Sequence, residues 1–375
     1  MTFRVGVIGG GQLARMMTPP ALALGIELQV FSETENSSAR LATTRVGDYT
    51  KVEQVREFAK NFDVITFDHE HVPLSVLETL EAEGFIIQPS PKALKFAQNK
   101  LHMRQRLSEL GLPMPVWAEI KTALELDQFI SENGGVAILK TPIGGYDGKG
   151  VAVVRTSADA SEWLEKIDEF GGSLLAEQKV NFVRELAQLV ARRPSGELAT
   201  WGLVQTVQRN GVCAEVLSPA PNSANTESAA KIAETVAIEL GVTGVLAVEM
   251  FETETGELYI NELAMRPHNS GHFTIEGSIT SQFEQHLRAV LDLPLGSTTP
   301  TAAHSVMINL LGVNNTNDFV SSYPEAMKAH PTAKFHTYGK AAREGRKMGH
   351  VTVIGNNAET VLAEARAAAS VCLKG

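Results

Sequence analysis

The chain has 375 residues, of which 43% are apolar and 20% are charged, and its formal net charge is −10. This length and composition are typical of a soluble globular protein with two or three domains. The negative charge argues against nonspecific binding to nucleic acid, because the surface as a whole repels a phosphate backbone. We therefore expect no nucleic-acid partner.

Targeting signals and cysteine use point to one compartment. The N-terminal sequence MTFRVGVIGGG lacks the basic, apolar and small-residue regions of a secretory signal. No run of 18 apolar residues occurs, so we expect no membrane span. Cys213 and Cys372 are the two cysteines, and because they lack metal-ligand spacing we interpret them as buried free thiols. These features predict a protein of the reducing cytoplasm.

Residues 1–100 alternate short apolar runs with helical patterns, which predicts an N-terminal parallel α/β domain. The predicted strands cover residues 4–8, 27–31, 64–67 and 85–87. The predicted helices cover residues 12–24 and 100–110, and the second is ended by Gly111 and two prolines.

Residues 101–292 are predicted to form a central domain, and residues 293–375 a small C-terminal domain. A small α+β unit is expected from residue 118 to about 178. The turn sequences PSGE and QRNG are typical of hairpins, so the strands that follow are predicted to be antiparallel. Further strands are expected at 184–190, 204–208, 212–217, 244–251, 258–262 and between about 304 and 354, with helices at 223–240 and 358–371.

Residues 137–154, AILKTPIGGYDGKGVAVV, place a loop with four glycines between two apolar runs. Lys140 ends the first run and Lys149 lies in the loop. Glycine allows backbone N–H groups to approach phosphates closely, and lysine supplies compensating charge. The loop is not a Walker A motif, because Gly150 follows Lys149 and a strand-like VAVV comes next. A hinged flap over a nucleotide is predicted, and a plain Gly-rich hairpin turn is the alternative.

Glu249 and Glu262 are predicted to face each other across a hairpin. A two-residue turn at Thr255-Gly256 pairs them directly, with Cβ atoms roughly 4.5–5.5 Å apart. Like charges in that position cost stability, but Mg²⁺ binds carboxylates together with nucleotide phosphates. The alternative is a shifted register that leaves one glutamate on a solvated face.

The N-terminal GVIGGGQLA permits two interpretations. Gly9, Gly11 and Ala14 satisfy the dinucleotide pattern G-x-G-x-x-A, and Glu33 follows the second strand. A phosphate or substrate turn at a helix N-terminus has the same pattern, and we favour this interpretation over NAD binding.

Polar clusters follow several predicted strands. In FDHEHVP, Glu70 lies at a strand end and is a candidate acceptor for sugar hydroxyls. His69 and His71 could ligate a metal, but their i, i+2 spacing at a strand end is more typical of solvated imidazoles. NELAMRPHNSGH places four polar side chains where they could face an anion: Arg266, His268, Asn269 and Ser270. KAAREGRKMGH adds the basic residues Lys340, Arg343, Arg346 and Lys347. Together these clusters indicate a phosphorylated sugar ligand.

Seven segments occur in the order of one known family: GGGQLARM, FDHEHVP, QNK, GGYDGKG, EQKVNFVRE, NELAMRPHNSGH and GRKMGH. The chain resembles the ATP-grasp superfamily and, within it, the family of 5-(carboxyamino)imidazole ribonucleotide synthetases. The resemblance implies an N-terminal α/β domain, an ATP-grasp domain with a glycine-rich flap, and a small C-terminal domain. It also implies an ATP- and Mg²⁺-dependent ligase of purine biosynthesis that joins bicarbonate to aminoimidazole ribonucleotide through carboxyphosphate, and a homodimer.

The resemblance implies a role for each residue that matches a motif of the family. The ATP phosphates are expected to contact Lys100, Lys140, Gly144, Gly145, Tyr146, Asp147, Gly148, Lys149 and Gly150. The adenine is expected to contact Glu177, Gln178, Lys179 and Val180, and the ribose is expected to contact Glu185. Gln208 and Asn261 are also assigned to the nucleotide. Magnesium is assigned to Glu249 and Glu262. The ribonucleotide and bicarbonate are assigned to Gly11, Gln12, Leu13, Glu70, Tyr146, Asp147, Arg266, His268, Asn269, Ser270, Lys340, Arg343 and Arg346. The expected catalytic residues are Tyr146, Asp147, Arg266 and Lys340, with Asp147 taking or orienting the amine proton.

The chain departs from the family pattern at four positions. Thr206 and Gln208 stand where the family often has Asn and His, Ala14 replaces a common Gly, and Glu344 replaces a common Pro. Three other functions are considered. An NAD-dependent oxidoreductase would rest on GGGQLA alone, and a nonenzymatic nucleotide-binding module would not need the glutamate pair. The related formate-dependent glycinamide ribonucleotide transformylase carries a Ser-rich loop instead of GGYDGKG.

Overall fold

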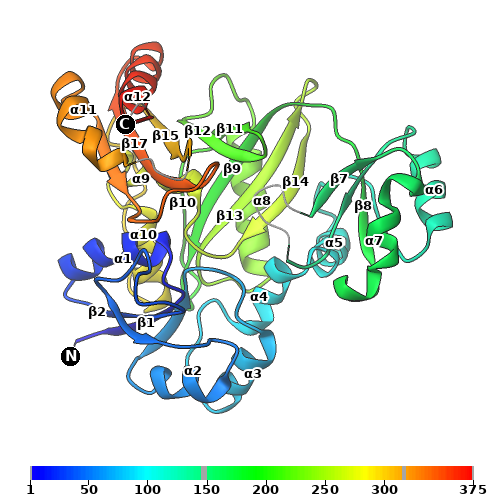
Figure 1. Ribbon diagram of the computed structural model, residues 1–375, viewed down its shortest axis with the longest axis horizontal. Coiled ribbons are helices and arrows are strands. Elements are labelled where there is room, and N and C mark those ends of the chain that lie inside the picture. The colour runs from blue at the N-terminus through cyan, green and yellow to red at the C-terminus, as the bar shows by residue number, and fades with distance from the viewer. Residues whose placement is uncertain (1, 145–149, 315–317, 374–375) are drawn as a thin grey trace.

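The computed structural model describes residues 2–144, 150–314 and 318–373. Its strands form three sheets within these residues (Figure 1). A four-stranded sheet lies near the N-terminus, a nine-stranded sheet runs through the centre, and a second four-stranded sheet lies at the far side. Many of the candidate functional residues lie between the first two sheets and the C-terminal segment.

The N-terminal sheet is parallel and has the strand order β3-β2-β1-β4. Parallel pairing brings the carboxyl ends of β1 and β4 to the same edge, where ligands of α/β proteins bind. In chain order its elements are β1 (Arg4–Ile8), α1 (Gln12–Ala23), β2 (Glu27–Ser32), β3 (Thr43–Val46), α2 (Val52–Ala59), β4 (Val64–Phe67), α3 (Leu74–Ala82) and α4 (Pro91–Gln98).

The predicted strand at 85–87 is wrong. Only an isolated parallel bridge joins Ile87 to Ile65, and Ile86 is exposed. The run lies between Gly84 and Pro89, and Pro89 has no N–H to continue a ladder. The other three N-terminal strands are confirmed.

The small antiparallel sheet has the order β5-β8-β6-β7. It follows α5 (Lys100–Glu109), whose first residue is set by Asn99: the Asn99 side chain accepts from Leu101 N–H at 2.9 Å and from His102 N–H at 3.1 Å. β6 and β7 pair as the flap prediction requires, with Lys140 opposite Val151. The elements are β5 (Trp117–Ile120), α6 (Ala123–Glu132), β6 (Ala137–Lys140), β7 (Val151–Val154), η1 (Ser157–Ala160), α7 (Ser161–Glu165), η2 (Ile167–Phe170) and β8 (Leu174–Gln178).

The nine-stranded sheet has the order β14-β13-β9-β11-β12-β15-β17-β16, with β10 added beside β9. The predicted C-terminal strands do not form a sheet of their own, because β15 pairs with β12 and extends the central sheet. The strands are β9 (Phe182–Arg192), β10 (Leu198–Thr200), β11 (Val204–Arg209), β12 (Val212–Ser218), β13 (Gly244–Thr253), β14 (Leu258–Ala264), β15 (His304–Leu311), β16 (Lys334–Thr337) and β17 (Lys347–Gly355).

Helices cover this sheet and complete the C-terminal segment. The long helix α12 packs on β15 and β17 around an apolar cluster of its own, as Figure 1 shows at the C-terminus. The remaining elements are α8 (Thr226–Glu239), η3 (Asn269–Gly271), α9 (Thr274–Gly277), α10 (Gln282–Val290), η4 (Phe319–Ser322), α11 (Tyr323–Ala329) and α12 (Ala358–Leu373).

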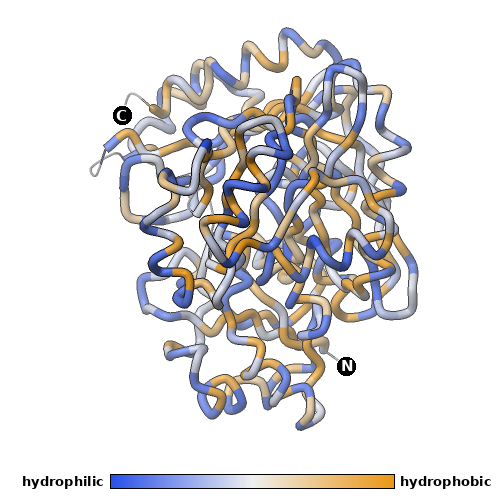
Figure 2. The backbone as a smooth tube through the Cα atoms, turned by 90° about the vertical axis from the view of Figure 1, so that its right-hand side faces the viewer, coloured by the Kyte–Doolittle hydropathy of each residue, from blue (hydrophilic) through white to orange (hydrophobic). Residues whose placement is uncertain are grey.

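One apolar core joins the N-terminal sheet to the central sheet. It includes Ile8 and Phe31 from the first and Leu186 and Leu246 from the second, all at most 1% exposed. Figure 2 colours the backbone by hydropathy and shows hydrophobic stretches through the interior and hydrophilic stretches at many outer turns. Among the described helices, none combines the length and apolar composition needed to cross a membrane. The shared core holds the two sheets in one relative position, which defines the cavity between them.

Candidate active site

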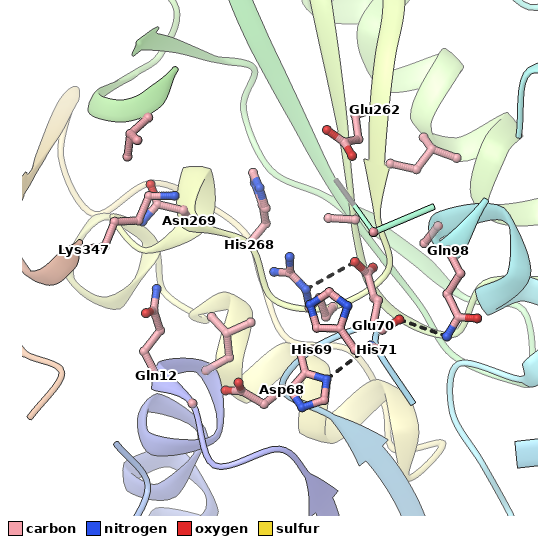
Figure 3. A pocket seen from close by; sticks show the side chains of 18 of the residues that line it. Gln12, Asp68, His69, Glu70, His71, Gln98, Glu262, His268, Asn269 and Lys347 are labelled. Carbon is pink, nitrogen blue, oxygen red and sulfur yellow. Dashed lines mark hydrogen bonds and ion pairs between the residues drawn. The ribbon is translucent and has the colours of Figure 1, made fainter. Parts of the chain in front are cut away.

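A cavity of about 950 Å³ opens where the N-terminal sheet, the central sheet and the C-terminal segment meet (Figure 3). Gln12 reaches it from the start of α1, Glu262 from β14 and Lys347 from β17. Ten residues assigned to the ribonucleotide and bicarbonate line this one cavity: Gly11, Gln12, Leu13, Glu70, Arg266, His268, Asn269, Lys340, Arg343 and Arg346. Four residues assigned to ATP or magnesium line it too: Lys100, Gly144, Glu249 and Glu262.

Several assigned residues lie elsewhere. Tyr146 and Asp147, with Gly145, Gly148 and Lys149, fall outside the described residues. The cavity lining also does not include the following described residues: Lys140, Gly150, Glu177, Gln178, Lys179, Val180, Glu185, Gln208, Asn261 and Ser270. Most of these lie on or beside β6 and β8 of the small sheet or on β9, β11 and β14 of the central sheet.

The predicted pairing of Glu249 with Glu262 is confirmed, but the turn and the register that produce it differ from the prediction. Glu249 is opposite Glu262, as predicted. The turn is not the predicted two-residue turn: Thr253 N–H bonds Glu257 O at 3.0 Å, so three residues form it. Met250 then pairs with Ile260, and a β-bulge restores the glutamate pair. Two errors of one residue therefore cancelled in the prediction.

The charges around the pair suit a divalent cation. Burial raises the pKa of Glu249, but His268, whose Nε2 lies 3.1 Å from its Oε1, lowers this pKa on balance together with Lys347 and Arg266. Glu262 forms an ion pair with Lys100. Among the described residues, no three His, Cys, Asp or Glu side chains are grouped to hold a metal by themselves. The two carboxylates fit Mg²⁺ that takes its other ligands from phosphate and water.

A buried charge cluster lies beside the pair. Lys140 Nζ donates to Glu177 Oε2 at 2.7 Å and to Asn261 Oδ1 at 3.0 Å, and burial lowers the pKa of Lys140. Burial raises the pKa of Glu177, but Arg104 and Lys140 outweigh it, so the pKa is lowered on balance. Because two cations engage the Glu177 carboxylate, the adenine assignment for 177–180 depends on the backbone and on the more exposed residues after Glu177.

Glu185 on β9 and Gln208 on β11 lie on neighbouring strands. Burial raises the pKa of Glu185, and the charge of Glu249 raises it further, whereas a hydrogen bond from Gln208 lowers it. The two side chains therefore contact each other close to Glu249.

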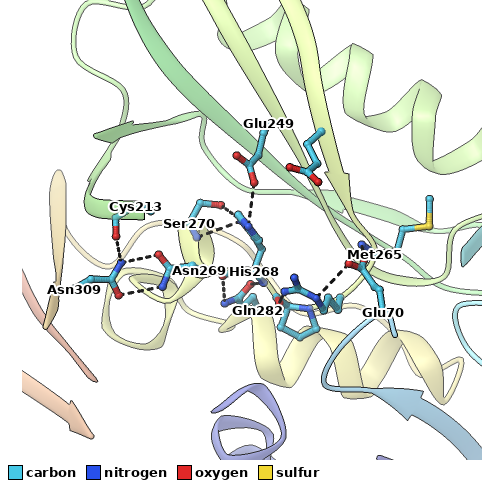
Figure 4. Close-up of polar contacts among 12 residues, drawn as sticks. Glu70, Cys213, Glu249, Met265, His268, Asn269, Ser270, Gln282 and Asn309 are labelled. Carbon is cyan, nitrogen blue, oxygen red and sulfur yellow. Dashed lines mark hydrogen bonds and ion pairs between the residues drawn. The ribbon is translucent and has the colours of Figure 1, made fainter. Parts of the chain in front are cut away.

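The loop after β14 is held by side chains that include Glu70, from the segment after β4, and Gln282 of α10 (Figure 4). Glu70 Oε1 accepts from Met265 N–H at 2.5 Å, and its Oε2 lies 3.5 Å from Arg266 Nε. Glu70 was predicted to accept sugar hydroxyls, and its carboxylate already supports this loop. Gln282 on α10 binds both backbone groups of His268: it accepts from the His268 N–H and donates to the His268 carbonyl, each over 2.8 Å.

Ser270 does not line the cavity, so its assignment to substrate stays a prediction. It is fully buried, and its Oγ lies 2.9 Å from His268 Nδ1. Ser270 therefore orients the imidazole whose other nitrogen faces Glu249. Asn269 lines the cavity and exchanges two amide hydrogen bonds with Asn309 of β15, at 3.1 and 2.7 Å. The sequence pattern did not single out Asn309 or Gln282, because both lie within regular elements.

Asp68 explains the glycine at the start of α1. Its Oδ1 accepts from Ala14 N–H at 2.7 Å, so this carboxylate caps the helix. A Cβ on Gly11 would collide with the same carboxylate. Asp68 lies in the FDHEHVP segment, but no local signal showed that it contacts α1.

The dinucleotide alternative finds no support at Glu33. His69 Nε2 lies 3.1 Å from Glu33 Oε1, and this hydrogen bond lowers the pKa of Glu33. The acid that would bind a nicotinamide nucleotide's ribose is thus already engaged.

Three family models match the chain. They are the Ribonucleotide synthetase preATP-grasp domain over residues 1–98, the ATP-grasp domain over 105–283, and the Phosphoribosylaminoimidazole carboxylase C-terminal domain over 305–364. Together they confirm the predicted ATP-grasp fold with an N-terminal and a C-terminal region.

Curated proteins named N5-carboxyaminoimidazole ribonucleotide synthase are similar along nearly the whole chain. One from Corynebacterium ammoniagenes is 46% identical over 374 residues, which cover 97% of this chain and 91% of the relative. One from Bacillus subtilis is 37% identical over 352 residues, covering 93% and 90%.

Solved structures agree with these relatives. The carboxyaminoimidazole ribonucleotide synthase from Aspergillus clavatus complexed with ATP has a TM-score of 0.89 and 34% identity, covering 99% of this chain and 98% of that one. Its complex with ADP and 5-aminoimidazole ribonucleotide also has a TM-score of 0.89 and 34% identity, covering 100% and 99%.

Proposed function

We propose a catalytic route for this chain, which belongs to the family of N5-carboxyaminoimidazole ribonucleotide synthases. It is an ATP-dependent carbon–nitrogen ligase of purine biosynthesis that acts on 5-aminoimidazole ribonucleotide. The predicted family and activity are confirmed. The oxidoreductase and the transformylase are not favoured, because relatives and solved structures that match nearly the whole chain are named as the synthase.

One observation carries the route: the glutamate pair and Lys100 line the same cavity as Lys340, Arg343 and Arg346. The first group suits the phosphates of ATP, and the second suits the phosphate of the ribonucleotide. Lys340 donates a hydrogen bond to the side chain of Gln12 and so joins the C-terminal segment to the start of α1, although the two residues are 328 positions apart. The two substrates would therefore meet near Arg266 and His268.

Bicarbonate is the proposed third substrate. One of its oxygens attacks the γ-phosphorus of ATP, the bond from that phosphorus to the β–γ bridging oxygen breaks, and ADP leaves. The amine of the ribonucleotide then attacks the carbon of carboxyphosphate, phosphate leaves, and the nitrogen loses a proton. Arg266, His268 and Asn269, which line the cavity, would bind the oxygens of the transferred group.

Charge neutralisation is the main contribution of the ATP side. Mg²⁺ held by Glu249 and Glu262 would neutralise charge that develops on the phosphates. Lys100 and Lys140 would bind phosphate oxygens once a nucleotide competes for them with Glu262 and Glu177. Asp147, in the flap outside the described residues, is the proposed proton acceptor. Closure of this flap would exclude water from carboxyphosphate, which hydrolyses readily.

Phosphate release tests the route. We expect release with ATP, Mg²⁺ and bicarbonate to rise strongly when aminoimidazole ribonucleotide is added, and to depend on bicarbonate. Release that is unaffected by the ribonucleotide, or that continues in bicarbonate-free buffer at the same rate, would contradict it.

The proposal also covers the compartment, the oligomeric state and the domain boundaries. The chain is proposed to act in the cytoplasm as a homodimer, with domains at 1–100, 101–292 and 293–375. Light scattering after size-exclusion chromatography measures the oligomeric state, and a mass of one chain, 40.4 kDa, would contradict the dimer.

A further inference from the structure

The hairpin that presents the glutamate pair is irregular next to the pair. Close to the turn, Met250 pairs with Ile260, so a regular hairpin would place Asn261 opposite Glu249. The register shift places Glu262 there instead. Successive residues of a strand point to opposite faces, so without the bulge Glu262 would lie on the other face of the sheet. The metal-binding pair therefore requires the bulge at Asn261.

Arg104 contacts this bulge from α5. It is fully buried, and its Nη1 donates to Ile260 O at 2.9 Å while its Nη2 donates to Asn261 O at 2.7 Å. Its Nε donates to Glu177 Oε1 at 2.6 Å. On the same strand, Ile260 N–H bonds Pro113 O at 2.9 Å. Groups from α5 and the segment after it thus bind the backbone of the bulge.

The same helix also contacts the metal-binding carboxylate. Lys100 lies four positions before Arg104, on the same helix face, and pairs with Glu262. Lys140 binds the side chain of Asn261, the extra residue of the bulge. Both the backbone and the side chain of Asn261 are therefore anchored to cations of the buried cluster.

We propose that Arg104 is a positioning residue for the metal site: its guanidinium holds the bulge carbonyls and so keeps Glu262 opposite Glu249. The inference rests on the proposed function, in which these two glutamates bind Mg²⁺. A planar guanidinium has five donors in a rigid fork, so it serves two carbonyls and a carboxylate at once. An ammonium at this position would keep the charge beside Glu177 but lose the fork.

Arg104→Lys separates these two contributions. Mn²⁺ is titrated into protein with saturating ADP and followed by electron paramagnetic resonance, and ADP affinity is measured separately without metal. We expect Mn²⁺ affinity to fall about ten- to hundredfold, the range seen when a partner of a metal ligand is removed. Metal-free ADP affinity should stay within about twofold of the parent, and excess Mn²⁺ should restore binding. Unchanged Mn²⁺ affinity would overturn the proposal.

Two further variants make the result specific. Arg366→Lys is the matched control, because Arg366 of α12 also pairs with a buried carboxylate, that of Glu215, at 2.7 Å. This control should leave Mn²⁺ affinity unchanged. Glu262→Gln tests the metal assignment itself. If Glu262→Gln leaves Mn²⁺ affinity unchanged, the proposed metal site is wrong. If it weakens Mn²⁺ and Arg104→Lys does not, only the role of Arg104 is overturned.

Folding is checked by thermal melting before each titration. Arg104→Gln, which keeps a donor for one carbonyl, is the second variant if Arg104→Lys does not fold, and it should weaken Mn²⁺ at least as much. If neither variant folds, Arg104 is a residue of general structural importance and its specific role at the metal site is refuted.

Discussion

Replacing Lys340 by methionine tests whether the C-terminal segment completes the ribonucleotide site. Lys340 lines the cavity, bonds Gln12 of α1 and lies 5.6 Å from the centre of the Tyr338 ring. Methionine keeps an apolar stem of similar length beside this ring but removes the charge and its donors. The substitution should therefore affect ligand binding more than packing.

The magnitude follows from the type of contact that is lost. A hydrogen bond to a charged group contributes about 1.5–3 kcal/mol, and bonds between two ions lie at the strong end. Lys340→Met should thus weaken aminoimidazole ribonucleotide about ten- to hundredfold. ATP affinity without the ribonucleotide should barely change, because the ATP phosphates and magnesium are assigned to Lys100 and the glutamate pair, which line the same cavity, and not to Lys340.

Calorimetric titration of each ligand separates the two effects. Lys334→Met is the matched control, since Lys334 is an exposed lysine of β16 outside the cavity lining. The control should bind both ligands as the parent does. Weaker ATP binding with unchanged ribonucleotide binding in Lys340→Met would refute our placement of the ribonucleotide, and so would an equal loss in Lys334→Met.

Two other predictions concern the metal pair and acid stability. Glu262→Gln should abolish most ATP turnover at limiting Mg²⁺, while the apo melting temperature changes by only a few degrees. Relief of repulsion from Glu249, about 1–3 kcal/mol at ~5 Å, is offset by the lost ion pair with Lys100. Near-parental turnover would contradict the assignment. Burial lowers the pKa of His286 to about 3. Below about pH 6.5 the unfolded chain therefore binds a proton that the folded chain does not. The free energy of unfolding should fall by about 1.4 kcal/mol for each pH unit below this value from His286 alone. Urea unfolding between pH 4.5 and 7 should show a shallower loss for His286→Gln, and an equal slope would refute this cause.

Much of the fold was readable from the sequence because the signals are local. Alternating apolar runs, helix caps and hairpin turns predicted most strands within a residue or two, as for β1, β4 and β6. The resemblance then identified the family, and fourteen of the residues that line the cavity were named in advance. The failed strand at 85–87 had the right composition but was too short between Gly84 and Pro89.

The tertiary structure alone decided how the site is held. Ser270 turned out to support His268 from the interior, and Glu70 to hold the backbone of Met265, since each depends on contacts between segments far apart in the chain. The bulge is the sharpest case. The sequence has no local signal for the extra residue at Asn261. Counting outward from the true three-residue turn would therefore place Asn261 opposite Glu249, and only a turn predicted one residue too short places Glu262 there. The sequence by itself therefore determined which residues and which chemistry the protein has. The register that brings the two carboxylates together was decided by Arg104, whose guanidinium binds a carbonyl 156 positions away, and a contact over that distance exists only once the chain has folded.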